Sequence, residues 1–157
     1  MNWTLDRIDF AILTALQEDG RLSNKELAAR VGLAPSSCHA RVRRLRDDGI
    51  VGHCRASIAP TALGIGLQAI VFVHLQNHTR SLVEGFRDHV LALPEVVALT
   101  HVGGRHDFLV QVAVRDARHL RDFALDALTS RPEVATVETS VVFEHVQGTL
   151  PVFATSR

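Results

Sequence analysis

Residues 23–45 read SNKELAARVGLAPSSCHARVRRL and carry the start and stop signals of two consecutive helices. Ser23 and Glu26 have the spacing of a capping box, in which each side chain accepts a hydrogen bond from the other residue's backbone N–H. Gly32 can adopt the left-handed conformation that ends a helix. Pro35 suits the first turn of the next helix, because the N–H that it lacks has no partner there. This stretch therefore predicts two short helices joined by a tight turn.

A further helix is predicted before this pair, and an extended segment after it. Before the pair, apolar residues recur at the spacing of a helix with one buried side: Leu5, Ile8, Ile12, Leu13 and Leu16. In the last helix Cys38, Val42 and Leu45 form the inward stripe. Residues 50–58 are expected to form a short hairpin or an extended wing. Three helices followed by a wing are the winged helix-turn-helix layout.

The last helix carries small polar residues in its first turn and arginines behind them. With Cys38 at the centre of the buried side, a rotation of about 100° per residue directs Ser36 and Arg43 outward. Serine and histidine can reach base edges in the major groove, and arginine can bind guanine or phosphate. The predicted DNA contacts are Ser36, Ser37, His39, Arg41, Arg43, Arg44 and Arg46 in the helix and Arg55 in the wing. The alternative is a charged, solvated face on an ordinary helix, and the helix spacing with the wing favours DNA binding.

The composition is that of a globular protein, with 157 residues, 46% hydrophobic residues and 17 cationic against 17 anionic side chains. Residues 1–60 carry a net charge of +2 and residues 61–157 a net charge of −2. A neutral total does not exclude DNA, because binding depends on the local field. Two cysteines are too few for a disulfide framework, and no signal peptide or membrane-length apolar run is evident. We therefore expect a cytoplasmic protein without a membrane partner.

The second half of the chain changes from helical periodicity to a mixed pattern. Residues 59–66, APTALGIG, are the expected linker, so the predicted domains are residues 1–58 and residues 67–157. Strands are predicted at residues 67–75, 96–102, 108–114 and 134–146, and helices at 82–93 and 120–128. The order strand-helix-strand-strand-helix-strand predicts a ferredoxin-like βαββαβ domain, and the whole chain an α+β protein. Ile70 and Phe72 would lie on the sheet face without helices, which predicts a partner subunit.

The turn between the two middle strands is the second candidate site. Gly103 and Gly104 let the backbone approach a ligand and expose N–H groups to a carboxylate, while Asp107 could hold an α-ammonium group. The alternative is a tight hairpin in which the aspartate bonds its own loop. Arg105 and His106 would tune the choice of ligand towards an acidic or polar one. Further wall residues of this pocket would be Thr100, His101 and Thr139.

No metal site and no cofactor are predicted. Cys38-His39 and His53-Cys54 form a mirrored pair, but Cys38 belongs to the buried stripe and His39 lies about 100° round the helix from it. The two side chains cannot easily face one ion. Several other histidines show no spacing typical of metal ligands and are expected at the surface: His74, His78, His89, His119 and His145.

The chain resembles the leucine-responsive regulatory protein/AsnC (Lrp/AsnC) family of transcription regulators. The resemblance rests on residues 5–51, LDRIDFAILTALQEDGRLSNKELAARVGLAPSSCHARVRRLRDDGIV, and on residues 102–116, VGGRHDFLVQVAVRD. It implies a palindromic double-stranded DNA operator, dimers that pair through their sheets, with either the dimer or an octamer as the final assembly, and an amino-acid effector bound near the 103–107 turn. One departure is Ala34, where the family usually has a serine or threonine cap. Loss of such a cap destabilises a helix by about 1 kcal/mol. Ser36 or Ser37 could compensate for it here.

Two other functions fit the same two-domain build. One is a partner protein that binds a ligand but no longer binds DNA. The other is an enzyme resembling the sirohaem decarboxylase subunits, which would need paired bases in a deep pocket. His101, Arg105 and His106 are the only candidates for such bases, and the chain contains no tyrosine. The intact arginine face favours a regulator that is not an enzyme.

Overall fold

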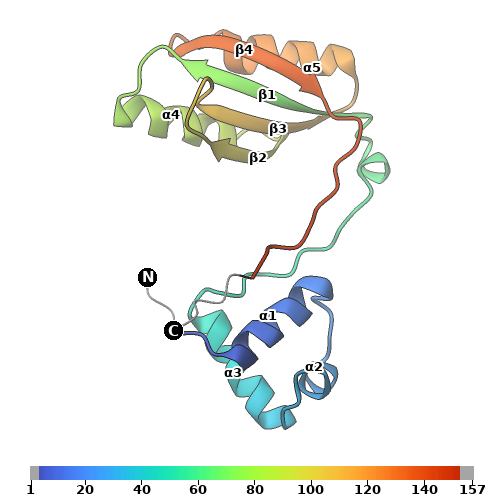
Figure 1. The fold of residues 1–157 in the computed structure, drawn as a ribbon. Coiled ribbons are helices and arrows are strands. Elements are labelled where there is room, and N and C mark those ends of the chain that lie inside the picture. The colour runs from blue at the N-terminus through green and yellow to red at the C-terminus, as the bar shows by residue number, and fades with distance from the viewer. Residues whose placement is uncertain (1–3, 153–157) are drawn as a thin grey trace. The chain divides into compact units, whose positions relative to one another are not determined.

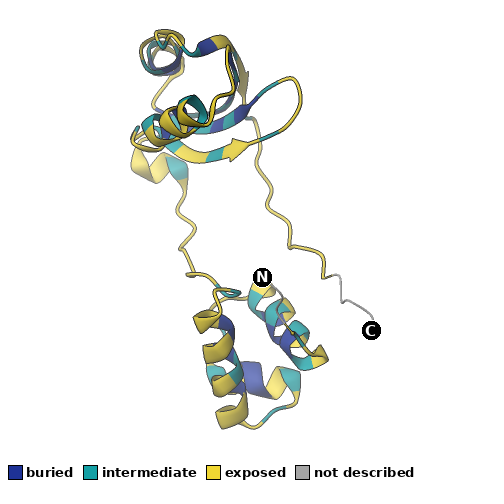
Figure 2. Cartoon of the chain, turned by 90° about the vertical axis from the view of Figure 1, so that its left-hand side faces the viewer, coloured by how far each residue is buried: buried dark blue, intermediate teal, exposed yellow. Residues whose placement is uncertain are grey.

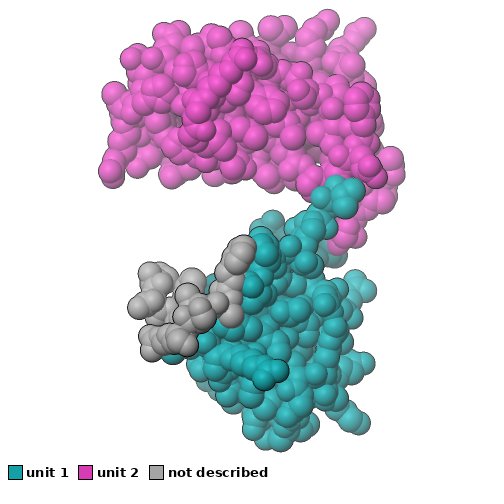
Figure 3. All heavy atoms as spheres, in the orientation of Figure 1, with its two compact units in different colours: residues 1–56, 146–157 teal, residues 57–145 magenta. Residues whose placement is uncertain are grey.

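The fold is that of a computed structural model, which describes residues 4–152. Residues 1–3 and 153–157 of the predicted domains lie outside the described part. The chain divides into two compact units, Met1–Ala56 with Val146–Arg157, and Ser57–His145 (Figure 3). The first unit is helical, and the second contains a sheet with helices (Figure 1).

Three helices build the first unit: α1 (Arg7–Glu18), α2 (Asn24–Val31) and α3 (Pro35–Asp47). The predicted capping box of α2 is present, and Gly32 ends that helix with a φ of 70°. The buried residues lie on the inward sides of the helices (Figure 2) and form one core: Ile12, Ala15, Leu27, Ala28, Cys38, Val42 and Leu45. The predicted inward stripe of α3 is therefore confirmed.

The two longest helices of this unit begin in different ways. Asp6 caps α1 by accepting hydrogen bonds from the N–H groups of Ile8 and Asp9, and Asp9 accepts one from the Asp6 N–H in return. By contrast, Ala34 stands at the N-cap of α3 and no side chain caps that helix. Neither Ser36 nor Ser37 donates or accepts a replacement hydrogen bond within the described residues.

The segment after α3 is extended rather than a hairpin. The N–H groups of Ile50 and Val51 both donate to the carbonyl oxygen of Leu45, and residues 52–58 form no strand. This extended form is one of the two that the sequence allowed for the wing.

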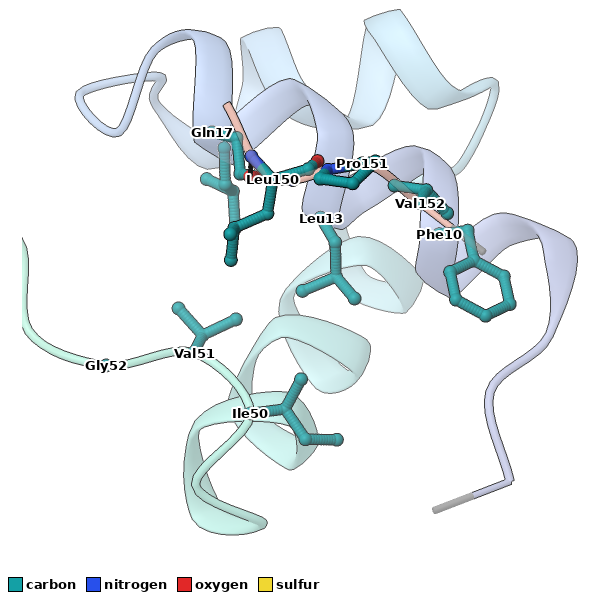
Figure 4. Close-up of a pocket in the computed structure, with 10 residues that line it drawn as sticks. Phe10, Leu13, Gln17, Ile50, Val51, Gly52, Leu150, Pro151 and Val152 are labelled. Atoms are coloured by element: carbon teal, nitrogen blue, oxygen red, sulfur yellow. Dashed lines mark hydrogen bonds between the residues drawn. The ribbon is translucent and has the colours of Figure 1, made fainter. Parts of the chain in front are cut away.

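The C-terminal segment lies in a different unit from the one predicted for it. Residues 67–157 were expected to form one domain, but in the described part of the chain residues 146–152 group with the helices. The reason is a contact with α1: the Leu150 N–H donates to Gln17 Oε1 at 2.8 Å, and Gln17 Nε2 donates to the Leu150 carbonyl at 3.5 Å (Figure 4). Leu150, Pro151 and Val152 thereby line an apolar groove on this unit together with Phe10, Leu13, Leu16, Gln17, Ile50, Val51 and Gly52.

The second unit has the predicted βαββαβ order. Its strands are β1 (Leu67–Leu75), β2 (Val96–His101), β3 (Phe108–Val114) and β4 (Val134–Val141). Its helices are α4 (Arg80–Leu91) and α5 (Ala117–Phe123), and α5 continues into the π-helical segment η2 (Ala124–Thr129). The strands pair antiparallel in the order β2-β3-β1-β4. The predicted fold is confirmed, although the last strand ends at Val141 instead of residue 146.

The two faces of this sheet differ. Alternate residues of β1 and β3 point towards the helices and form the core with them: Ala69, Val71, Val73, Leu75, Phe108, Val110, Val112, Val114, Phe86, Val90, Leu120, Phe123, Leu128 and Val134. The opposite face carries Ile70, Phe72 and Leu109, each only partly buried. Phe143, which was expected inside the last strand, lies beyond its end and is fully exposed in this chain.

The predicted linker is largely ordered on the second unit. Pro60–Leu63 form a short 3₁₀ helix, η1, closed by Gly64 at a φ of 75°. The N–H of Gly66 donates to the carbonyl oxygen of Val114, and a Cβ at residue 66 would stand 2.4 Å from the Arg115 carbonyl oxygen. This close approach explains why residues 57–66 group with the sheet rather than forming a free connection.

Candidate functional site

The outward face of α3 is solvent-exposed along its length. Ser36, Ser37, His39, Arg43 and Arg46 are all exposed, as the helical rotation predicts. The Arg43 side chain is 75% exposed, and its one acidic neighbour among the described residues is Asp47, with a long Nε···Oδ2 separation of 3.6 Å. The exposed Arg55 follows in the extended segment. This face therefore offers free guanidinium, hydroxyl and imidazole groups from one helix.

Two of the predicted DNA contacts are instead engaged inside the unit. Arg41 Nη1 lies 2.6 Å from Asp6 Oδ2 and 2.9 Å from Asp9 Oδ1. Arg44 Nη2 lies 2.6 Å from Asp9 Oδ2. The Asp9 side chain is only 1% exposed, whereas those of Arg41 and Arg44 are 29% and 48% exposed. Arg41 in particular faces carboxylates rather than free solvent.

The buried Asp9 carboxylate ties α1 to α3. Its oxygens accept from two arginines of α3 and from the Asp6 N–H at the start of α1. The Asp9 N–H and then the Arg41 guanidinium hold the pKa of Asp6 below its usual value. In return, the hydrogen bonds to Asp6 and Asp9 raise the pKa of Arg41 further. Since a charge-assisted network of this kind fixes side-chain geometry, it sets the orientation of α3 against α1.

Asp107 is already satisfied within the chain. It is buried, its N–H donates to the Val73 carbonyl, and its Oδ2 accepts from the Leu75 N–H at 2.7 Å. Its Oδ1 accepts from His78 Nε2, also at 2.7 Å. Burial alone would raise the pKa of this carboxyl, but the hydrogen bonds from Leu75 and His78 and the charge of the histidines hold it below its usual value. Asp107 therefore fastens the 103–107 turn to the end of β1.

The other predicted effector residues do not all meet at one place. Strand pairing sets Thr100 opposite Leu109, on the open face of the sheet, and Arg105 Nη2 reaches Glu138 Oε1 at 3.0 Å. His101 instead pairs with Phe108 on the helix side, where the two rings stack at 4.7 Å. Thr139 pairs with Val71, also on the helix side of the sheet. Gly103 and Gly104 lie in the turn, and Gly104 has a φ of 128° that favours glycine.

Two functional candidates were missed from the sequence because their partner is distant along the chain. His74 and His78 were expected to be surface histidines without ligand spacing, yet both converge on Asp107. Among the described residues, these three side chains form a group whose ligand atoms all lie within 4.8 Å of one another. The paired cysteines and histidines of the first unit form no such group in the described residues, and Cys38 is fully buried with a pKa raised by that burial.

No helix within residues 4–152 is long and apolar enough to cross a membrane.

Both units match known families. Residues 5–51 match the winged helix-turn-helix DNA-binding family, and residues 68–152 match the Lrp/AsnC ligand binding domain. The chain is 42% identical to the HTH-type transcriptional regulator AldR of Mycolicibacterium smegmatis, over 94% of this chain and 86% of the relative. It is 36% identical to the leucine-responsive regulatory protein of Rhizobium meliloti, over 91% of this chain and 92% of that protein.

A solved structure supports the same assignment. The transcriptional regulator NMB0573 of Neisseria meningitidis, crystallised as a complex with L-Met, superposes with a TM-score of 0.84 at 37% identity, covering 94% of this chain and 97% of that one. The relatives are transcription regulators, which points away from an enzyme. The chain therefore belongs to the Lrp/AsnC family and is a DNA-binding transcription regulator with a ligand-binding domain.

Proposed function

We propose that the outward face of α3 reads DNA in the major groove, with Arg43 as its main base contact. The observation that carries this proposal is the exposure of Arg43, whose one ion pair within residues 4–152 is the long contact with Asp47. Ser36, Ser37 and His39 stand in the first turns, where a docked helix approaches base edges. Arg46 and Arg55 would contact phosphates beside the groove.

Arg41 and Arg44 then act mainly by positioning. Arg41 would have to leave both Asp6 and Asp9 in order to reach DNA, and Arg44 would have to leave the buried Asp9. Removing a partner from a buried carboxylate costs free energy, so these ion pairs oppose direct contact. Their proposed role is to hold α3 at the angle at which Arg43 meets the base pairs.

The test is a band-shift or anisotropy titration of the full chain on the region upstream of its own gene. Arg43→Ala should weaken specific binding by about 1–3 kcal/mol, or about 5- to 150-fold, if Arg43 reads a base. Arg118→Ala in the second unit removes the same charge and should change affinity less than about 2-fold. Equal weakening by Arg43→Ala on unrelated DNA would make Arg43 a phosphate contact. Lack of any wild-type binding at low salt would overturn DNA reading and favour a partner protein that only binds a ligand.

We further propose that two copies pair through the open face of the sheet and bind a palindromic operator. Ile70, Phe72 and Leu109 leave this face partly apolar, and one helix pair presents few cations on its own. A two-fold dimer places two α3 helices on successive half-sites. Sedimentation equilibrium should give a dimer or a larger assembly such as an octamer, and a monomer at operator-binding concentrations would contradict this arrangement. A regulator of chromosomal DNA is expected in the bacterial cytoplasm, and we extend that expectation to this chain.

The proposed effector is an amino acid bound near the 103–107 turn. The support comes from the Neisseria relative, whose crystal structure is a complex with L-Met. In this chain Thr100 and Arg105 are the candidates on the open face, while His101 and Thr139 belong to the opposite side. A calorimetric titration with the common amino acids would identify the ligand. Arg105→Ala should weaken its binding, and an unchanged affinity would remove Arg105 from the pocket.

A further inference from the structure

Three side chains converge where β1 ends and the loop to α4 begins. His74 is near the end of β1, His78 lies in the loop, and Asp107 immediately precedes β3. His78 Nε2 is 2.7 Å from Asp107 Oδ1, and His74 Nδ1 is 2.9 Å from Asp107 Oδ2. The two imidazole rings have their centroids 5.7 Å apart. The two imidazole groups and the carboxylate thus offer three ligand atoms that all lie within 4.8 Å of one another.

The His74 contact is close without being a hydrogen bond. Its Nδ1 is buried and lacks a hydrogen-bond partner within the described residues, although Asp107 Oδ2 is only 2.9 Å away. A buried ring nitrogen without a partner is costly, so the arrangement needs an explanation. Two ligands of one ion show this geometry, because each directs its lone pair at the metal and not at the other ligand.

We propose that His74, His78 and Asp107 bind a divalent transition-metal ion of the zinc class. Two histidines with one carboxylate are a common protein ligand set for zinc, with a fourth position left for water or another ligand. Ligand atoms about 2.0–2.1 Å from a tetrahedral ion lie about 3.3 Å from one another. The three donor atoms here lie within 4.8 Å of one another, so no pair has to close by more than about 1.5 Å to reach this separation.

The surroundings of the three residues suit a bound cation. The Leu75 N–H donates to Asp107 Oδ2 at 2.7 Å and fixes the carboxylate, as outer hydrogen bonds do at known metal sites. Asp107 is nearly buried, while the His74 and His78 side chains are 38% and 53% exposed, which gives the ion a path from solvent. A bound ion would link the 103–107 turn to the loop before α4. This site goes beyond the DNA-reading function and does not depend on it.

The direct test is metal binding by the untagged full chain after treatment with a chelator. Zinc is titrated calorimetrically, bound metal per chain is measured by elemental analysis, and cobalt is used as a spectroscopic probe of coordination by nitrogen and oxygen. His78→Ala and His74→Gln each remove one ligand, and circular dichroism checks that both variants fold. His145→Ala is the matched control, because His145 is exposed and lies outside the triad.

Wild type and His145→Ala should each bind one zinc per chain with the same affinity. Loss of a residue that only hydrogen-bonds to a metal ligand weakens metal binding by about 10- to 100-fold. His78→Ala and His74→Gln each remove a ligand itself, so their affinity for zinc should fall by at least this factor. Sub-stoichiometric binding by the wild type, or binding by either folded triad variant that equals the wild type, would overturn the proposal. In that case the histidines only pair with Asp107. DNA binding is scored separately, so its failure would leave the result on the metal unaffected.

Discussion

The substitution Asp9→Asn tests whether one buried carboxylate joins α1 to the DNA-reading helix. Asparagine keeps the shape of the side chain but removes its charge, and it places an amide donor opposite an arginine. In the native chain Asp9 accepts from Arg41 at 2.9 Å and from Arg44 at 2.6 Å, and its side chain is 1% exposed. Both ion pairs should therefore be lost together.

The size of the destabilisation by Asp9→Asn depends on how far Asp9 and its arginine partners are buried. Removing one partner of a fully buried ion pair costs about 3–5 kcal/mol. Here Arg41 and Arg44 are 29% and 48% exposed, so water can replace part of what they lose. A hydrogen bond to a charged group contributes about 1.5–3 kcal/mol, and we expect a net loss of about 2 kcal/mol in the free energy of opening this unit.

Hydrogen exchange measured on the full chain localises the effect. The slowest amides of α1 and α3 should exchange about 30-fold faster in Asp9→Asn, since about 1.4 kcal/mol corresponds to a factor of ten. Amides of the sheet should be unaffected. Asp47→Asn is the matched control, because Asp47 faces Arg43 across 3.6 Å with both side chains largely exposed, and such pairs contribute about 0.5 kcal/mol or less. Similar small effects in the two variants would refute a structural role for Asp9.

Three further predictions concern stability. Ala34→Ser should stabilise the first unit by about 1 kcal/mol in urea denaturation, because Ala34 already has the extended N-cap conformation but no side chain to cap α3; no gain would mean that the start of α3 is satisfied in another way. Gly66→Ala should destabilise the second unit by about 1–3 kcal/mol, because the added Cβ would collide with the Arg115 carbonyl oxygen. Gly85→Ala is the matched control: Gly85 lies in α4 with no atom near its Cβ position, so alanine should stabilise the unit by about 0.5–1 kcal/mol. Folding lowers the pKa values of Asp6, Asp107 and Glu133. These three carboxylates therefore stabilise the fold fully above their unfolded pKa values of about 4, and this stabilisation is lost as the pH falls through their folded pKa values. A free energy of unfolding that stays constant down to about pH 2 would contradict this linkage.

Local signals in the sequence predicted the fold well. The capping box at Ser23 and Glu26, the left-handed Gly32 and the stripe of Cys38, Val42 and Leu45 each depend on residues within a few positions of one another. Such interactions involve only neighbouring residues, so they can be recognised in the sequence. The alternation of β1 likewise predicted which of its residues face the helices.

Long-range side-chain contacts could not be predicted in the same way. Arg41 and Arg44 were assigned to DNA from their helical rotation alone, and nothing local indicates a buried carboxylate 32 and 35 residues earlier. The contact of Leu150 with Gln17, separated by 133 residues, has no periodic signal at all. Long flexible side chains reach partners that only the tertiary fold brings near, so helical rotation alone could not predict the ion pairs of Arg41 and Arg44 with Asp9.

The two buried aspartates, Asp9 and Asp107, have similar surroundings but partners of different chemistry. Asp9 and Asp107 are each nearly inaccessible, and each receives two cationic or basic side chains and one backbone N–H. The partners of Asp9 are arginines, which stay protonated at any physiological pH and bind no metal, so that network is permanent. The partners of Asp107 are histidines, and the imidazole side chain is a common metal ligand. The arginine network therefore suits a fixed support for a DNA-reading helix, while the histidine network suits a site whose state changes with its ligand.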